Sequence, residues 1–310
     1  MNRESKANPD DSAGELPDAD ASSRQEEREV WSIGIYTGDS PLRLSSPSGV
    51  VNPVLTKNDV TDVEASFVAD PFMLVEDGAY YMFFEVMNSE SDTGEIGLAI
   101  SNDGFRWEYR QIVIKEDFHL SYPYVFKWEG EYYMTPETLG AEAILLYKAI
   151  HFPLIWSRSS SLVVGTYADP SIFRFANLWW IFACPRPSYH DALRLYYCDQ
   201  LAGRWREHPQ SPIVEGNPRT ARPAGRVTAW GGNLIRFAQD CVPRYGSRVR
   251  AFQINEMTAE KYDDEEAAES PVLCAGSEGW NSSGMHTIDP HLTAHGKWIA
   301  CVDGCRDEIE

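Results

Sequence analysis

Carboxylates at repeated positions beside apolar strands are the residues of this sequence best suited to chemistry. The stretch ADPFMLVEDGAYYMFFE runs from Ala69 to Glu85 and contains Asp70, and ADPSIFRFANLWWIFAC places Asp169 in the same context 99 residues later. Carboxylates that share a site shift one another's pKa values, so that one can act as an acid while another acts as a base. Each Asp-Pro also has an architectural explanation, because Pro is tolerated at the first residue of a strand and Asp caps turns. The number and placement of these Asp-Pro positions must decide between a chemical and an architectural role.

Five units of the sequence share a plan of strand, tight turn and aromatic strand. They read ADPFMLVEDGAYYMFFE, SYPYVFKWEGEYYMTPE, ADPSIFRFANLWWIFAC, ARPAGRVTAWGGNLIRFAQ and TIDPHLTAHGKWIACVD. The opening position is held in turn by Asp70, Tyr122, Asp169, Arg222 and Asp289. The closing position is held by Glu85, Glu137, Cys184, Gln239 and Asp303.

The spacing of these units predicts an all-β fold, a five-bladed β-propeller. Successive opening residues lie 52, 47, 53 and 67 residues apart, which is the scale of four-stranded blades. Further strand pairs between the units carry Trp107, Trp156 and Trp205 at matching places. The fifth unit meets the end of the chain, so we expect residues 31–44 to complete the last blade and close the ring. A β-sandwich would explain frequent short strands but not five copies in register.

The propeller hypothesis brings the opening residues together, because the first strand of each blade lines the central channel. Three carboxylates and one guanidinium would meet there, and buried charges need partners. Arg222 could pair with the aspartates and only fill the channel, or the ring could form a polar binding site, which clustered carboxylates favour. The candidate substrate-binding residues are Arg222, Asp289, Tyr122, Glu85, His286 and Gln239.

These motifs, with the opening WSIGIYTGDSP, resemble a known family from about residue 31 to 304. The family is the N-terminal propeller domain of glucosamine inositolphosphorylceramide transferases. It is similar in turn to the five-bladed propellers of glycoside hydrolase family 43 and of arabinanase, levansucrase and invertase type. The resemblance implies that carbohydrate is handled at the axial pocket, by a glycoside hydrolase-like enzyme.

The resemblance also implies roles for the catalytic candidates Asp70, Asp169 and Glu137. In family-43 enzymes an Asp of the first blade is the general base, and an Asp about one hundred residues later orients the site and tunes its pKa values. Asp70 and Asp169 match these two. The general acid is a Glu in the following blade, but here Arg222 stands at that position and cannot donate a proton at ordinary pH. Glu137 or Glu85 is the best replacement, and Asp289 with His286 is a third choice.

Arg222 suggests an alternative in which the propeller binds carbohydrate without turnover. A guanidinium favours an anionic glycan, a sugar phosphate or a glycolipid headgroup through a two-pronged contact. Such a binding module would work beside a partner glycosyltransferase, since the related transferases carry their glycosyl transfer in a separate domain. A third interpretation makes the ring purely structural.

Composition excludes several other classes of function. The net charge of -20 argues against nucleic acid as a partner, and no apolar window is long enough for a membrane span. We expect residues 1–28 to be a disordered acidic tail and residues 29–310 to form one domain. The N-terminus lacks the apolar core of a secretory signal, which favours a cytoplasmic location. The six cysteines lack zinc spacing and read as free buried thiols, so no metal or other cofactor is expected.

Overall fold

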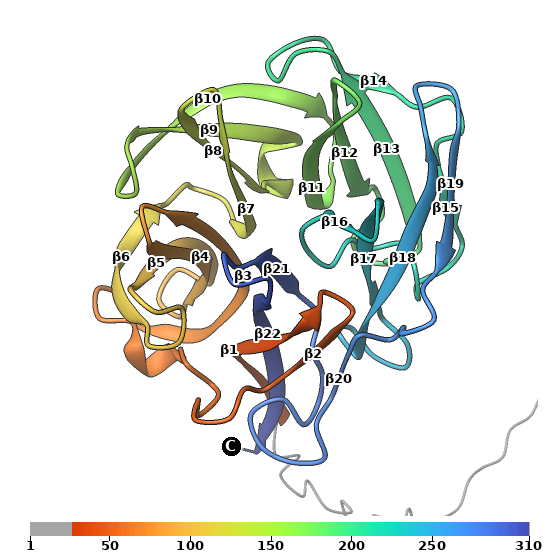
Figure 1. Cartoon of the computed structure of the whole chain (residues 1–310). Coiled ribbons are helices and arrows are strands. Elements are labelled where there is room, and N and C mark those ends of the chain that lie inside the picture. Colours follow the sequence, from red (N-terminus) through yellow and green to blue (C-terminus); the bar gives the residue numbers. More distant parts are fainter. Residues whose placement is uncertain (1–26, 310) are drawn as a thin grey trace, which may run out of the picture.

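The computed structural model describes residues 27–309, and they form a five-bladed β-propeller (Figure 1). Each blade is an antiparallel sheet whose first strand lies nearest the common centre. The fold class expected from the repeats is therefore confirmed. The predicted disordered tail at 1–28 lies outside the described residues except for its last two positions, which belong to the first strand.

The strands follow the predicted units in order. The first two blades contain β3 (Ala65–Glu76), β4 (Ala79–Asn88), β5 (Thr93–Ser101) and β6 (Glu108–Ile114), then β7 (Ser121–Trp128), β8 (Glu131–Glu137), β9 (Ala143–His151) and β10 (Ile155–Val164). The third contains β11 (Ala168–Phe175), β12 (Leu178–Cys184), β13 (Ala192–Cys198), β14 (Arg206–Glu207) and β15 (Val214–Glu215). The fourth contains β16 (Thr228–Trp230), β17 (Asn233–Asp240), β18 (Arg248–Met257), β19 (Tyr262–Glu266) and β20 (Leu273–Cys274).

The fifth blade joins the two ends of the described chain. It orders its strands as β2 (Arg43–Ser45), β1 (Glu27–Ser40), β22 (Trp298–Ile309) and β21 (Ile288–Leu292). The register of β1 with β22 runs from Glu27 opposite Ile309 to Gly38 opposite Trp298. The N-terminal strand thus completes the last blade as expected, although it begins a few residues earlier. Pairing in this way protects both strand edges.

Helical structure is confined to two short 3-10 turns, η1 (Lys57–Asp59) and η2 (Leu139–Ala141), within residues 27–309. No helix in that range has the length and apolarity that crossing a bilayer would require. All six cysteines are free thiols. Five of them are buried, as the sequence suggested, and Cys274 is exposed.

Tight turns set the register of the inner hairpins. In the first four blades two residues join the inner strand to the next, and both have positive φ angles: Asp77 50° and Gly78 81°, Glu129 51° and Gly130 82°, Ala176 49° and Asn177 63°, Gly231 61° and Gly232 87°. This conformation matches a type I′ turn, whose twist suits that of the flanking strands. The repeated turn places the closing residue of each unit opposite its opening region.

The core lies between neighbouring blades. The largest cluster of buried side chains spans the first three blades, from Phe72 through Tyr147 to Tyr196. The repeated tryptophans at the outer strands pack at the margins of the core, Trp156 and Trp205 against this cluster and Trp107 against the cluster beside it. Each makes the same kind of hydrogen bond to a backbone carbonyl. The indole of Trp107 donates to Gly104 O (3.1 Å), that of Trp156 to Pro153 O (2.9 Å), and that of Trp205 to Leu201 O (3.2 Å). Their matching places in the sequence therefore reflect matching places in the fold.

A left-handed bulge opens the inner strand in three blades. Asp70, Tyr122 and Asp169 have φ angles of 52°, 48° and 50°, and the pairing register shifts at each of them. A Pro follows each residue, and a residue without an N–H is tolerated at a bulge. The bulge turns the opening residue out of the pleat, next to the end of the closing strand. Asp-Pro thus has an architectural role in these units, and it also positions the site.

Candidate functional site

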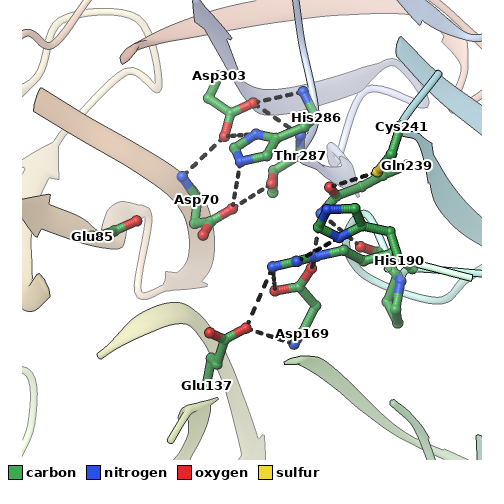
Figure 2. Close-up of polar contacts among 12 residues, drawn as sticks. Asp70, Glu85, Glu137, Asp169, His190, Gln239, Cys241, His286, Thr287 and Asp303 are labelled. Carbon is green, nitrogen blue, oxygen red and sulfur yellow. Dashed lines mark hydrogen bonds and ion pairs between the residues drawn. The ribbon is translucent and has the colours of Figure 1, made fainter. Parts of the chain in front are cut away.

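A cavity of about 200 Å³ lies on the axis where the inner strands begin. Its wall combines carboxylates with basic and aromatic side chains: Trp31, Asp70, Glu85, His119, Glu137, Arg222, Tyr245 and His286. The carboxylates come from the opening bulge of the first blade and from the closing ends of β4 and β8. Figure 2 shows Asp70, Glu85 and Glu137 reaching the open centre from different directions. We call this cavity the axial pocket.

Asp70, in the first blade, is held in place by residues of the neighbouring fifth blade. Its Oδ1 accepts a hydrogen bond from Thr287 Oγ1 (2.6 Å), and its backbone N–H donates to Asp303 Oδ2 (3.0 Å). Burial raises the pKa of Asp70 to about 7, against the opposing pull of the His286 charge. The carboxylates of Asp169 and Asp303 push the pKa in the same upward direction. Asp70 is therefore near half-ionised at neutral pH, which suits a general base or acid.

His286 lies between two carboxylates. Its Nδ1 is 2.7 Å from Asp303 Oδ2, and its Nε2 is 3.7 Å from Asp70 Oδ1. The ring stacks on Trp31 with centroids 4.0 Å apart and meets Tyr245 edge-on at 5.1 Å. Burial alone would lower the pKa of His286, but Asp303 and Asp70 raise it to about 9. The imidazole is thus a fixed cation that is already paired.

Glu85 lies in the wall of the axial pocket next to His119. Its Oε1 is 3.2 Å from Nε2 of His119, a half-buried residue of the segment before β7. Nδ1 of His119 accepts the Gly94 N–H at 2.9 Å, so in this arrangement Nε2 carries the proton. Burial lowers the pKa of His119, and Glu85 more than offsets this by raising it. A second proton, on Nδ1, would however face the Gly94 N–H, so the geometry favours the neutral ring.

Glu137 closes the second blade and contacts the third. Its Oε2 accepts the backbone N–H of Asp169 at 3.1 Å, as Asp303 accepts that of Asp70. Burial and the Asp169 carboxylate raise the pKa of Glu137 well above its usual value, and Arg222 opposes them. A carboxyl group in this environment favours its protonated form, which a general acid needs.

Arg222 is fully engaged by the protein. Its Nε is 2.5 Å from Asp169 Oδ2, and its Nη2 lies 3.3 Å from Asp169 Oδ1 and 3.6 Å from Glu137 Oε2. Its Nη1 is 3.3 Å from Pro187 O and 3.0 Å from His190 Nδ1, and the Tyr245 ring covers the guanidinium at 4.9 Å. The two-pronged contact with an anionic ligand expected from the sequence is therefore taken by Asp169.

Several predicted residues lie in or against the axial pocket. Asp70, Glu85, Glu137, Arg222 and His286 line it. Asp169 is buried beneath Arg222, with 1% of its surface exposed. Gln239 is also buried, and its Nε2 donates to Asp169 Oδ2 at 2.8 Å. Both residues support the pocket wall from behind.

Tyr122 and Asp289 do not reach the axial pocket, so the expectation that one hollow gathers every opening residue is wrong for these two. The Tyr122 hydroxyl hydrogen-bonds Ser171 Oγ at 2.9 Å in the fully buried core. Asp289 lies deeper because the fifth unit has no bulge: Ile288 pairs with Val302 and Asp289 with Cys301 without a register shift. Thr287 therefore takes the place that the sequence alignment gave to Asp289.

Asp289 instead belongs to a second polar cluster further along the axis. Its Oδ1 accepts from Arg226 Nε (2.5 Å), and its Oδ2 accepts the Met73 N–H (2.5 Å) and contacts His291 Nε2 (2.8 Å). Nη2 of Arg226 donates to Met73 O (3.2 Å) and Val125 O (2.9 Å). Burial would raise the pKa of Asp289, but Arg226 and His291 lower it. We call this set the Arg226 cluster.

Sequence reasoning missed four residues of the axial site: Asp303, Thr287, Trp31 and Tyr245. Asp303 could have been found, because it holds the same closing position as Glu85 and Glu137. Thr287 could be found only by knowing that the fifth unit lacks the bulge. Trp31 comes from β1 and Tyr245 from the loop between β17 and β18, both outside the five units. No repeat could signal these two aromatic residues.

Asp70, His286 and Asp303 are also the residues with metal-ligand spacing, since their ligand atoms all lie within 4.8 Å of one another. In this arrangement the two carboxylates already flank the imidazole as its ion-pair partners. A divalent cation would have to replace the shared proton of His286. The donor set is therefore accounted for by the three residues themselves.

Comparison with known sequences identifies relatives of the whole propeller. The family described as "Glucosamine inositolphosphorylceramide transferase 1, N-terminal" matches residues 23–305. The protein of that name from Oryza sativa subsp. japonica is 36% identical over 320 residues, covering 94% of this chain and 41% of the relative. The Arabidopsis thaliana protein is 33% identical over 304 residues, covering 91% of this chain and 40% of the relative. The chain thus spans about two fifths of the length of these relatives.

Comparison with solved structures supports the fold. A putative glycoside hydrolase from Parabacteroides distasonis has a TM-score of 0.61 at 11% identity, covering 83% of this chain and 95% of the other. An α-L-arabinanase from Cellvibrio cellulosa, solved with arabinohexaose, has a TM-score of 0.52 at 16% identity, covering 77% and 96%. At these identities the likeness is one of fold alone.

Proposed function

The chain belongs to the family of the N-terminal domain of glucosamine inositolphosphorylceramide transferases, and we propose that it is a carbohydrate-processing propeller of glycoside hydrolase-like type. One observation carries the proposal. Asp70 and Glu137, two buried carboxyl groups with raised pKa values, face the same cavity of about 200 Å³. This volume is below the roughly 300–1,000 Å³ of sites for drug-sized ligands, which suits a single sugar ring.

In the proposed reaction a glycosidic C–O bond is exchanged for a bond to water. Glu137, held protonated by burial and by Asp169, gives its proton to the departing oxygen. Asp70, with a pKa of about 7, accepts the proton of the attacking water. Asp169 is a positioning residue, because its N–H fixes the Glu137 carboxyl and its side chain is the ion-pair partner of Arg222. Glu137 thereby supplies the proton that Arg222 cannot.

A second candidate is a sugar-binding module without turnover, acting beside a glycosyltransferase. One contact favours it: Nη2 of Arg222 is 3.6 Å from Glu137 Oε2 and stabilises the ionised form of that carboxyl. An ionised Glu137 can accept hydrogen bonds from sugar hydroxyls but cannot protonate a leaving group. Because the donors of Arg222 are taken, this module would bind a neutral or cationic glycan rather than an anionic one.

The test is a turnover screen of furanosides, pyranosides and oligosaccharides with product analysis by mass spectrometry. We expect at least one substrate to be cleaved, and Asp70→Asn and Glu137→Gln each to lower kcat by about 100-fold or more. Glu76→Gln, the same charge change at the Glu76–Lys127 pair beside the first hairpin turn, should retain activity. Sugars that raise the melting temperature without being cleaved would favour the binding module. No cleavage and no thermal shift with any sugar would reject both candidates.

A further inference from the structure

We propose that the end of the propeller opposite the axial pocket is a docking surface for a second copy of this chain. The axial pocket lies where the inner strands begin. Because neighbouring strands of a blade run antiparallel, the turns that follow the first and the third strand of each blade lie together at the other end, which we call the turn face. Its inner turns are residues 77–78, 129–130, 176–177, 231–232 and 293–297, and its outer turns are residues 41–42, 102–107, 152–154, 199–205 and 258–261.

Exposed apolar side chains are concentrated on the turn face. Among residues 27–309, eleven large apolar side chains are exposed, and eight of them lie in these turns or within two residues of them: Val75, Phe105, Ile150, Leu154, Ile155, Phe175, Trp230 and Leu292. The other three lie elsewhere: Val51, Val164 and Tyr189. Single exposed apolar side chains are ordinary on a protein surface, whereas their concentration on one face marks a contact surface.

Every blade contributes an apolar residue where its inner strand ends. The last residue of the inner strand is Trp128, Phe175, Trp230 and Leu292 in the second to fifth blades, and Val75 is the last but one in the first blade. Phe175, Trp230 and Leu292 expose 39%, 38% and 61% of their surface. A cavity of about 550 Å³ lies between the inner strands of the first, second and fifth blades, and Val75 and Leu292 belong to its wall. Such a cavity can receive an apolar side chain of a partner.

Charged side chains of the turn face are largely paired with one another. Six cations in or beside these turns each contact a carboxylate: Lys127 with Glu76, Lys148 with Glu131, Arg106 with Asp103, Arg206 with Asp199, Lys261 with Glu256 and Lys297 with Asp39. The chain carries a net charge of -20, and like charge of this size opposes self-association. A second copy therefore approaches most easily at a face where charges are compensated and apolar side chains are exposed.

The same pairing favours a second copy over a lipid surface. Peripheral binding to a membrane uses Lys and Arg side chains that are free to meet anionic headgroups. Lys127, Lys148 and Lys297 are each held by a carboxylate instead. In a two-fold dimer the same patch meets itself, so apolar side chains around one axis face those around the other. Both axial pockets then point away from the contact, so the inference does not depend on the proposed carbohydrate function.

Sedimentation equilibrium of the wild-type chain measures the association. We expect a reversible dimer with a Kd below about 100 μM in about 0.5 M NaCl. The Kd should be at least about threefold higher in about 0.05 M NaCl, because salt screens the repulsion between two acidic chains. A chain that stays monomeric at about 200 μM in both salts would overturn the inference. So would a dimer that weakens as salt is added, since its contact would then be ionic. A monomer that binds vesicles of phosphatidylcholine would assign the turn face to lipid and reject the second copy.

Leu292→Glu tests the assigned face, with Val164→Glu as the matched control. Val164 is the last residue of β10, is 82% exposed and lies at the other end of its blade, so the control adds the same charge away from the turn face. We expect Leu292→Glu to raise the dimer Kd at least about tenfold and Val164→Glu to leave it within about twofold. Val75→Glu, in the same cavity wall, should act as Leu292→Glu does, and melting temperatures confirm that each variant is folded. An unchanged Kd in both cavity variants, or an equal loss in Val164→Glu, would overturn the inference.

Discussion

The axis of the propeller carries two arginine–aspartate pairs, Arg222 with Asp169 at the axial pocket and Arg226 with Asp289 in the Arg226 cluster. Both pairs are buried, and both join neighbouring blades. In the Arg226 cluster the Asp289 carboxylate has a donor at each oxygen, and Arg226 also binds two backbone carbonyls. Around Arg222 the same kind of pair is surrounded by carboxyl groups that are only half satisfied. The same residue types therefore form a structural ion pair in the Arg226 cluster, which we call the brace, and part of the candidate site at the axial pocket.

The difference lies in whether each charge is compensated. Asp289 has a lowered pKa because Arg226 and His291 outweigh its burial. Asp70 and Glu137 have raised pKa values because burial and neighbouring carboxylates outweigh the nearby cations. A compensated cluster stabilises the fold, whereas an uncompensated one stores unfavourable energy that a ligand or a proton can relieve. Substitutions in the two clusters should therefore change stability in opposite directions.

The largest effect is expected for Asp289→Asn. The substitution keeps the shape of the side chain but leaves the Arg226 guanidinium buried without its counter-ion. Removing one partner of a buried pair typically lowers the free energy of unfolding by about 3–5 kcal/mol. Urea denaturation at pH 7.5 measures the change. A loss below about 1 kcal/mol would show that the Arg226 cluster is not a brace.

The next effect is a loss of stability with rising pH that depends on His286. Its pKa is about 9 in the folded protein and near 6.5 in the unfolded chain, so its contribution is complete below pH 6.5 and is lost as the pH rises through 9. The change is on the order of 3 kcal/mol. Asp70 acts in the same direction at lower pH, since its raised pKa favours the folded state below about pH 4 and the benefit is lost through pH 7.

Urea midpoints between pH 4 and pH 9.5 measure this slope in the wild type and in His286→Gln. The substitution should flatten the slope above pH 6.5 and leave the part below pH 6 in place. A wild-type stability that stays level up to pH 9.5 would show that His286 is neutral in the folded protein.

Much of this arrangement follows from the sequence, and the exceptions share a cause. The five units in register predicted the number of blades, the pairing of the two chain ends in the last blade, and the meeting of Asp70, Asp169 and Arg222 near the axis. These features could be predicted because strand pairing and turns are encoded locally. Asp289 was misplaced because its Asp-Pro dipeptide is the same as that of Asp70. The backbone bulge that separates the two is present at Asp70 and absent at Asp289, so the dipeptide alone does not specify it.

The aromatic wall and the state of Arg222 were also beyond the sequence. Trp31 and Tyr245 reach the axial pocket from segments that have no repeated counterpart. The type of residue at position 222 predicted a positive charge but could not tell whether a ligand or Asp169 would take it. That choice is made by side-chain geometry, which a pattern of residue types does not specify.

A smaller effect, opposite in sign to that of Asp289→Asn, is expected for Asp70→Asn at pH 8. The ionised Asp70 is unfavourable in its buried position, and Asn retains the Thr287 contact and tolerates the left-handed φ of 52°. The loss of its attraction to His286 offsets part of the gain, so we expect the free energy of unfolding to rise by roughly 1–2 kcal/mol. Urea denaturation of Asp70→Asn and Asp289→Asn under the same conditions compares the two changes in the free energy of unfolding directly. Equal destabilisation by both substitutions would remove the distinction between site and brace.

The smallest effect is expected for Tyr122→Phe, which probes the buried layer between the axial pocket and the Arg226 cluster. The substitution deletes one hydrogen bond, to Ser171 Oγ, while Ser171 still donates to Gly225 O at 3.1 Å. Loss of one buried hydrogen bond whose partner stays satisfied lowers the free energy of unfolding by about 0.5–1.5 kcal/mol. Because the hydroxyl does not line the cavity, sugar affinity measured by calorimetry should be unchanged. A fall in affinity of tenfold or more would place Tyr122 among the ligand contacts after all.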